Sequence, residues 1–293
     1  MRYKHQSRRT SASLSPLAFG TRSRVGTLVG RILLGLTLCV WIGPIYWLVN
    51  TAFKLKVQIQ SPEPVWFPHP VTLENMQWVF QNLDTSAFFR SLRVVPISVG
   101  IALVCGLLMA YALSRLHTRY NGQLETWIIS TRMMPPAAMI VPFYFLALQA
   151  HLLNSEFGLV VVYIAIDLPL VVWMMLAFLR SVPADSEEAA WIDGCSVWQA
   201  FFRIVIPMMR TSILSGGLLV LILGWNEFFV AFVLMSSNIT FPVQVGSFLA
   251  VGLNPQYGHM AAAGLLLSLP PMLVAVVFRR ALLSGVHAFA GGK

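Results

Sequence analysis

The sequence predicts an all-α membrane protein with six transmembrane helices. Of its 293 residues 57% are hydrophobic and only 11% are charged, and the mean hydropathy is +0.72. A soluble domain carries about 25% charged residues. A helix needs about 20 mostly apolar residues to cross the hydrocarbon core. Six segments meet this length, with ends placed to within a few residues: 31–53, 92–114, 126–149, 158–179, 211–235 and 260–283.

Two segments outside these spans differ in composition from the rest of the chain. Residues 1–30 are basic and rich in Ser, and we expect a disordered tail there, ahead of a permanent first span. The apolar run that follows continues too far for a cleaved signal peptide. The loop after the first span is rich in Pro and Trp ("SPEPVWFPHP") and then reads as a short amphipathic helix, "LENMQWVFQNL".

The basic residues predict the orientation, because Lys and Arg are retained preferentially in cytoplasmic loops. With six spans, fifteen of the 20 Lys and Arg residues fall on the side of the N-terminus, four fall on the other side, and Arg132 lies within a span. Both termini are therefore predicted to be cytoplasmic. We interpret the net charge of +9 as a record of this topology and expect no nucleic-acid partner. The three Cys residues have no metal-site or disulfide spacing.

The cytoplasmic loop at about 183–207 is unusually polar for this chain. Asp185 followed by Glu188, and Ser196 followed by Gln199, resemble two capping boxes that begin helices. Between them Gly194 supplies a helix stop, because Gly adopts the left-handed conformation found there. The loop is therefore predicted to hold two short helices joined at Gly194.

The second of these helices has one apolar face and a proline that we expect to end it. Trp198, Phe201, Phe202 and Val205 follow the i, i+3, i+4, i+7 spacing, and Pro207 comes two residues later. Helices this short are marginal alone in water and need a docking surface. The surface is either the end of the helical bundle or a partner protein. The acidic start of the loop disfavours an anionic membrane surface.

The same loop resembles the EAA motif of ABC importer permeases, which reads EAA, three residues, G, nine residues, I, one residue, LP. Here Ile206 replaces Leu and the other positions match. In that family the loop forms a coupling helix that sits in a cleft of the ATP-hydrolysing subunit. The resemblance implies that the ATPase-coupling residues are Glu188, Ala189, Ala190, Gly194, Ile204 and Pro207.

The resemblance extends over residues 30 to 293, to carbohydrate permeases of the maltose type. It is carried by "TLENMQWVF", "GLLMAYALSRL", "MMPPAAMIVPFYFL", "GWNEFFVAFVLMSS" and the C-terminal "LLSGVHAFAGGK". It implies a type I ABC importer permease fold in a bacterial inner membrane, and a carbohydrate or polyol substrate. The implied partners are a second permease, two ATPase subunits and a periplasmic substrate-binding protein. The sequence contains no Walker A pattern, so we expect ATP and Mg to bind the ATPase subunits, and no cofactor, metal or catalytic residue in this chain.

Three charged residues lie within the predicted spans, where each costs an estimated 2.5 to 3.5 kcal/mol or more at the centre. They are Arg132, Asp167 and Glu227. Arg132 either has a functional role or snorkels to the cytoplasmic interface, whereas Asp167 and Glu227 either line a pathway or pair within the bundle. A sugar needs hydrogen bonds and flat apolar surfaces, so the predicted translocation pathway comprises Asn226, Glu227, Asp167, Trp225 and Tyr163. Ordinary helix packing is the alternative for each aromatic residue.

The prolines within the spans predict interruptions or kinks of the helices at Pro135-Pro136, Pro142, Pro169 and Pro270-Pro271. These points are either hinges or, where a proline is isolated, purely structural kinks. Two other functions compete with an ABC permease. An ion-coupled secondary transporter would use Asp167 or Glu227 as its proton carrier, but leaves the EAA-like loop unexplained. The second competing function, an intramembrane enzyme, is not supported, because the sequence has no His pair, Ser–His pair or paired carboxylates at catalytic spacing.

Overall fold

A computed structural model describes residues 24–116, 119–248 and 256–282, and within these ranges the secondary structure is helical without strands. One π-helical segment, Phe201–Val205, lies between α9 and α10. The α-helices are α1 (Arg24–Ala52), α2 (Lys56–Ile59), α3 (Glu74–Asn82), α4 (Thr85–Arg115), α5 (Asn121–Arg132), α6 (Pro136–Gln149), α7 (Glu156–Leu179), α8 (Asp185–Ile192), α9 (Val197–Ala200), α10 (Ile206–Trp225), α11 (Phe229–Leu234), α12 (Phe241–Ser247) and α13 (Tyr257–Val277).

The predicted spans are present as five long apolar helical stretches and one broken pair in the described ranges. The continuous stretches are 28–52, 85–115, 156–179, 197–225 and 257–277. The pair consists of α5 and α6, which are bent by 92° at their junction. Counting that pair as one span gives the six that the sequence predicts.

The chain divides into two units, residues 1–47 and 48–293. In the first unit the described part is helix α1, which begins at Arg24, inside the segment predicted as a disordered tail. The rest of that predicted tail, residues 1–23, lies outside the described residues, as does the Gly-rich C-terminal segment that resembles the family's closing tail.

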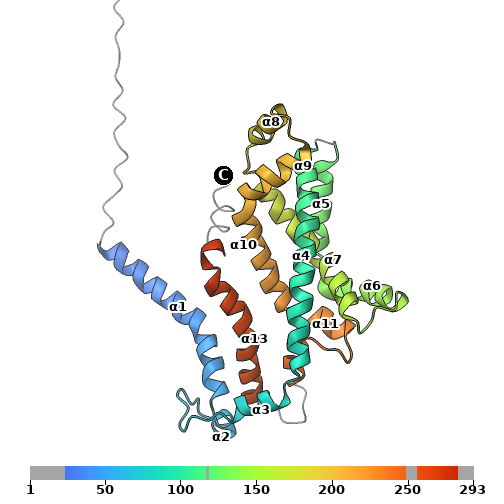
Figure 1. The fold of residues 1–293 in the computed structure, drawn as a ribbon. Helices are drawn as coiled ribbons and strands as arrows, with labels where there is room; N and C mark the ends of the chain where they lie inside the picture. The colour runs from blue at the N-terminus through green and yellow to red at the C-terminus, as the bar shows by residue number, and fades with distance from the viewer. Residues whose placement is uncertain (1–23, 117–118, 249–255, 283–293) are drawn as a thin grey trace, which may run out of the picture. The chain divides into compact units, whose positions relative to one another are not determined.

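The core of the second unit is built on α4 and α7, which run side by side, with α10 packed against both (Figure 1). Gly106 on α4 permits the close approach to α7. A Cβ atom there would lie 2.5 Å from Cγ1 of Val171 and 3.4 Å from the backbone nitrogen of Val172. Any larger residue at Gly106 would therefore force the two helices apart.

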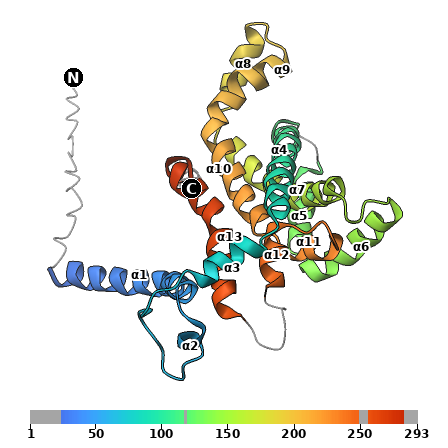
Figure 2. The same cartoon turned by 60° about the horizontal axis from the view of Figure 1, so that its bottom comes forward.

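The predicted amphipathic helix is confirmed as α3, which packs against α13. Trp78 stacks on His259 with ring centroids 4.0 Å apart. Asn75 is buried and its amide nitrogen donates to the carbonyls of Ala52, at 3.1 Å, and Lys54, at 2.8 Å. Helices α2 and α3 lie at one end of the second unit, and α8 and α9 lie at the opposite end (Figures 1 and 2).

The interruption of the third span predicted at Pro135-Pro136 is confirmed. Helix α5 ends at Arg132 and α6 begins at Pro136, and the intervening backbone includes Pro135 in an extended conformation. A proline has no N–H to donate and disfavours helical geometry in the residue before it, so two in succession end the helix. By contrast Pro142, Pro169 and Pro270-Pro271 lie inside continuous helices, so no break occurs there, and the kinks expected at these prolines stay predictions.

The fifth span ends earlier than predicted. Helix α10 stops at Trp225, and α11 begins at Phe229 after three residues, Asn226 to Phe228. The amide nitrogen of Asn226 donates to the carbonyl of Ile222 at 2.7 Å, which satisfies a carbonyl at the helix end. The polar pair Asn226-Glu227 thus marks a helix boundary within the apolar segment.

Candidate functional site

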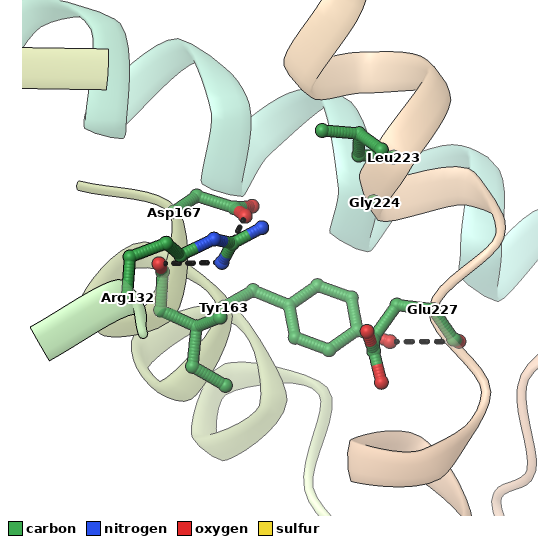
Figure 3. A pocket seen from close by; sticks show the side chains of 7 residues that line it. Arg132, Tyr163, Asp167, Leu223, Gly224 and Glu227 are labelled. Atoms are coloured by element: carbon green, nitrogen blue, oxygen red, sulfur yellow. Dashed lines mark hydrogen bonds and ion pairs between the residues drawn. The ribbon is translucent and has the colours of Figure 1, made fainter. Parts of the chain in front are cut away.

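A small polar cavity lies inside the second unit, where α5, α7, α10 and the start of α11 meet (Figure 3). Its volume is about 100 Å³. It is lined by Arg132, Tyr163, Ile166, Asp167, Leu223, Gly224 and Glu227. Three of the five predicted pathway residues, Tyr163, Asp167 and Glu227, are therefore in its lining, and the other two, Trp225 and Asn226, are not.

Arg132 and Asp167 form an internal ion pair across the cavity wall. Nη1 of Arg132 lies 3.8 Å from Oδ1 of Asp167 and donates to the carbonyl of Ile166 at 2.9 Å. The side chain of Asp167 is 8% exposed, whereas that of Arg132 is 32% exposed. Arg132, the last residue of α5, therefore points toward α7 (Figure 3). Snorkelling, the alternative expected from its position near a span end, does not describe this arrangement.

Glu227 and Tyr163 form the other wall. Oε1 of Glu227 accepts a hydrogen bond from the backbone nitrogen of Val230 at 3.0 Å, which caps the first turn of α11. The hydroxyl of Tyr163 donates to the backbone carbonyl of Glu227 at 3.4 Å. The side chains of Asp167, Tyr163 and Glu227 are thus brought together at one cavity, as the pathway hypothesis requires.

Trp225 and Asn226 do not line this cavity. Trp225 is 3% exposed, and its Nε1 donates to the carbonyl of Leu267 on α13 at 3.0 Å. Its ring packs against Phe88 and Phe241, with centroids 5.8 Å and 6.2 Å away. Asn226 is exposed at the end of α10. For Trp225 the packing alternative therefore describes the structure.

A second cavity of about 210 Å³ shares Arg132, Ile166 and Glu227 with the first. Its remaining lining is apolar and comes from the break after α5, from α6 and from α11: Met134, Met139, Ile140, Phe143 and Val230. The predicted pathway does not include these apolar residues, although the interruption predicted at Pro135-Pro136 is the sequence signal for the break beside this cavity.

The loop at 183–207 has the predicted helix–Gly–helix form. Gly194 has φ +87°, in the left-handed region that favours glycine. The second capping box is confirmed: Oγ of Ser196 accepts from the backbone nitrogen of Gln199 at 3.3 Å, and Oε1 of Gln199 accepts from that of Ser196 at 2.8 Å. The first is wrong, because Asp185 is already inside α8 and Ala184 precedes it without a side-chain cap. The acids in the first turn still favour the helix through its dipole.

Pro207 does not end the second helix, contrary to the prediction. It is the second residue of α10, and the helical path runs from Val197 to Trp225. The π-helical turn places a hydrogen bond from the nitrogen of Ile206 to the carbonyl of Phe201, one residue wider than in an α-helix. The four residues of the predicted apolar face differ in burial. Phe201 and Val205 are buried, whereas Trp198 and Phe202 are 62% and 59% exposed.

The EAA-like residues fall on both sides of the loop. Glu188, Ala189, Gly194 and Pro207 are exposed, Ile204 is half-buried and Ala190 is buried. Ile192, between the EAA residues and Gly194, is 87% exposed. The loop therefore presents an acidic and apolar surface, with small residues in it, beyond the end of the helical bundle (Figure 1).

Several helices long enough to cross a membrane surround an internal polar cavity, and this arrangement is that of a polytopic membrane protein. The family model of binding-protein-dependent transport system inner membrane components matches residues 102–287. The chain is 30% identical to the sulfoquinovosyl glycerol transport system permease protein SmoH of Agrobacterium fabrum, over 84% of this chain and 87% of that protein. It is also 30% identical to the diacetylchitobiose uptake system permease protein DasC of Streptomyces coelicolor, over 90% of this chain and 98% of that protein. The chain belongs to this family, the permease subunits of ABC transporters.

Solved structures agree in fold. The crystal structure of a bacterial ABC transporter involved in the import of the acidic polysaccharide alginate superposes with a TM-score of 0.74. The two chains are 22% identical, and the match covers 91% of this chain and 99% of the other. The alginate transporter in complex with an alginate pentasaccharide-bound periplasmic protein matches with a TM-score of 0.61 at 15% identity, over 89% of this chain and 99% of that one. The ABC importer permease fold expected from the EAA-like loop is thereby confirmed.

Proposed function

We propose that this chain is one of two permease subunits of an ATP-driven importer for a carbohydrate or polyol. The observation that carries the substrate class is the set of relatives, whose names specify sulfoquinovosyl glycerol, diacetylchitobiose, trehalose and lactose as the solutes moved. The cavity residues suit such a solute, because Asp167, Glu227 and Arg132 supply hydrogen-bonding groups next to the ring of Tyr163.

The proposed mechanism is alternating access, with import from the periplasm to the cytoplasm. Ligand pockets for small molecules occupy roughly 300–1,000 Å³. The polar cavity, at about 100 Å³, is too small for a sugar in this conformation. The helices around it must therefore separate to admit the solute. The break between α5 and α6 and the break after α10 are the places where the wall can change shape without melting a long helix.

The energy for this change comes from ATP bound, with Mg, by two ATPase subunits. The exposed motif residues of the 183–207 loop, Glu188, Ala189 and Gly194, would dock in them, and the loop would transmit their movement. A periplasmic binding protein would deliver the solute at the opposite end, near α2 and α3. This arrangement requires both termini to be cytoplasmic, in agreement with the distribution of Lys and Arg.

The test is co-purification and stimulated ATP hydrolysis. The chain is expressed with the second permease, the ATPase and the binding protein encoded by neighbouring genes, and the complex is reconstituted in lipid. We expect a stable complex whose ATP hydrolysis rises when the binding protein is added with trehalose, lactose or diacetylchitobiose. A permease that purifies without any ATPase subunit would contradict the proposal and would favour an ion-coupled carrier.

A further inference from the structure

Glu187 is a buried carboxylate in an otherwise exposed loop. It lies in the first turn of α8, immediately before the motif residue Glu188, and only 1% of its side chain is exposed. Asp185 and Glu188 on either side of it are exposed. A buried charge is costly unless it is paired and hydrogen-bonded, so the surroundings of Glu187 must supply partners.

Both partners come from one helix, α4. Oε1 of Glu187 accepts from Nε of Arg115 at 2.8 Å and from Nη2 at 2.5 Å, and Oε2 accepts from the hydroxyl of Tyr111 at 2.8 Å. Tyr111 and Arg115 are four residues apart and lie on the same face of the helix. Each carboxylate oxygen is therefore satisfied, and the first turn of α8 is fixed to the last turn of α4.

The cluster also reaches the start of the fifth span. The ring of Tyr111 packs against Phe201, with centroids 4.7 Å apart, and Phe201 is the first residue of the π-helical turn. Nη2 of Arg115 lies 3.4 Å from the carbonyl of Val182, in the segment that leads into α8. Thus Tyr111, Arg115 and Glu187 join α4, α8 and the helix that continues into α10.

A second ion pair near this end of the unit, between Arg180 and Glu125, is different in kind. Arg180 and Glu125 are 2.6 Å apart, but the side chain of Arg180 is 61% exposed. Exposed pairs of this sort contribute little, because water screens them and two long side chains lose freedom. In the Glu187 cluster the side chain of Arg115 is 17% exposed. Both donating nitrogens of Arg115 contact the same carboxylate oxygen, and such charge-assisted hydrogen bonds are stronger than neutral ones. This cluster is therefore suited to keep α8 fixed to α4 when a partner displaces the loop.

We propose that the Glu187–Arg115–Tyr111 cluster is the positioning device that makes α8 move together with α4. It rests on the proposed function, in which a partner ATPase displaces the exposed side of the loop. Glu188 and its neighbours face that partner, whereas Glu187 faces inward and passes the displacement to α4, which packs along α7 beside the cavity. Without the cluster, α8 would shift over the end of the bundle while the membrane helices stayed in place.

The test compares Glu187→Gln, Arg115→Gln and the double variant in the complete complex reconstituted in proteoliposomes. The readout is the amount of trehalose, lactose or diacetylchitobiose imported per ATP hydrolysed. Coupling between sites in proteins typically changes an equilibrium by 5–150-fold. We expect each single variant to lower the ratio by about fivefold or more. The double variant should be no worse than either single one, because both remove the same interaction. Asp185→Asn is the matched control on the exposed side of α8 and should behave as wild type.

The amount of ATPase that co-purifies should be the same in Glu187→Gln as in wild type, because the docking surface is intact. A loss of co-purification, an unchanged transport-to-ATP ratio or additive losses in the double variant would each overturn the inference. Glu187→Gln preserves the size of the side chain and is expected to fold. Tyr111→Phe, which removes one hydrogen bond, supplies a milder variant with a smaller fall.

A second readout separates this inference from the proposed function. If the wild-type complex does not import sugar with ATP, the proposed transport function is refuted. The role of the Glu187–Arg115–Tyr111 cluster can then still be tested in the permease. There, hydrogen–deuterium exchange of the α8 backbone should be faster in Glu187→Gln than in Asp185→Asn. Equal exchange in these two variants would refute the anchoring of α8, whatever the transport assay shows.

Discussion

The ion pair between Arg132 and Asp167 makes an asymmetric prediction about stability. Replacing Arg132 with Met removes the charge that faces a carboxylate of which only 8% is exposed, and also frees the carbonyl of Ile166. Replacing Asp167 with Asn instead leaves the charge on an arginine side chain that is 32% exposed and can turn toward water. The first change should therefore destabilise the protein more than the second.

The magnitudes follow from the geometry. Two unit charges 3.8 Å apart attract by about 4 kcal/mol at an effective dielectric constant of 20. Removing one partner of a fully buried pair costs about 3–5 kcal/mol. Because Arg132 is partly exposed, we expect Arg132→Met to cost about 2–3 kcal/mol and Asp167→Asn about 1 kcal/mol. Arg132→Met combined with Asp167→Asn should cost less than the sum of the two, since no carboxylate is then stranded.

The assay is equilibrium unfolding of the purified permease in mixed micelles of dodecyl maltoside and sodium dodecyl sulfate, followed by circular dichroism. The exposed pair Arg180–Glu125 provides the control, because Glu125→Gln should change stability by at most about 1 kcal/mol. Equal costs for Arg132→Met and Asp167→Asn, or a double variant that is fully additive, would refute the pairing.

Three further predictions concern single residues. Gly194→Trp should leave the permease inserted in the membrane but abolish co-purification of the ATPase. A Cβ at Gly194 meets nothing within 4 Å in this chain, so the indole ring would face the partner. Gly194→Ala adds only the strain of φ +87° and should still co-purify with the ATPase. Phe201→Ala should cost about 3–5 kcal/mol in the same unfolding assay, whereas Phe202→Ala, at an exposed position, should stay within about 0.5 kcal/mol. Trp225→Phe should lower the free energy of unfolding by about 1–2 kcal/mol, because the hydrogen bond to Leu267 is lost. The KM for uptake should be unchanged, and a raised KM would indicate that Trp225 contacts the solute.

The periodic and compositional features of the chain were predictable from sequence. Long apolar runs located the spans, and the spacing from Glu188 to Pro207 pointed to the family that the comparisons confirm. Ser196 and Gly194 were read correctly because capping and left-handed turns depend on a few neighbouring residues. These are local signals, and the structure preserves them.

The errors share a physical cause, which is that hydropathy does not report backbone continuity. The apolar pattern resumes directly after the polar pair Asn226-Glu227, so the break in the fifth span was not predicted, whereas Pro135-Pro136 predicted the break in the third. Pro207 looked like a helix stop, but a π-helical turn before it accommodates the missing N–H. Glu187 was overlooked beside Glu188 because its burial depends on Arg115, which lies 72 residues earlier in the chain.

The central claim is that ATP, and not an ion gradient, drives carbohydrate uptake through this permease. The most direct measurement is the import of radiolabelled trehalose, lactose and diacetylchitobiose by proteoliposomes that contain the complete complex, with binding protein outside and ATP inside. The account predicts that at least one of these sugars accumulates with ATP, and that a protonophore leaves its import unchanged. Import that continues without ATP and collapses when the protonophore is added would contradict it.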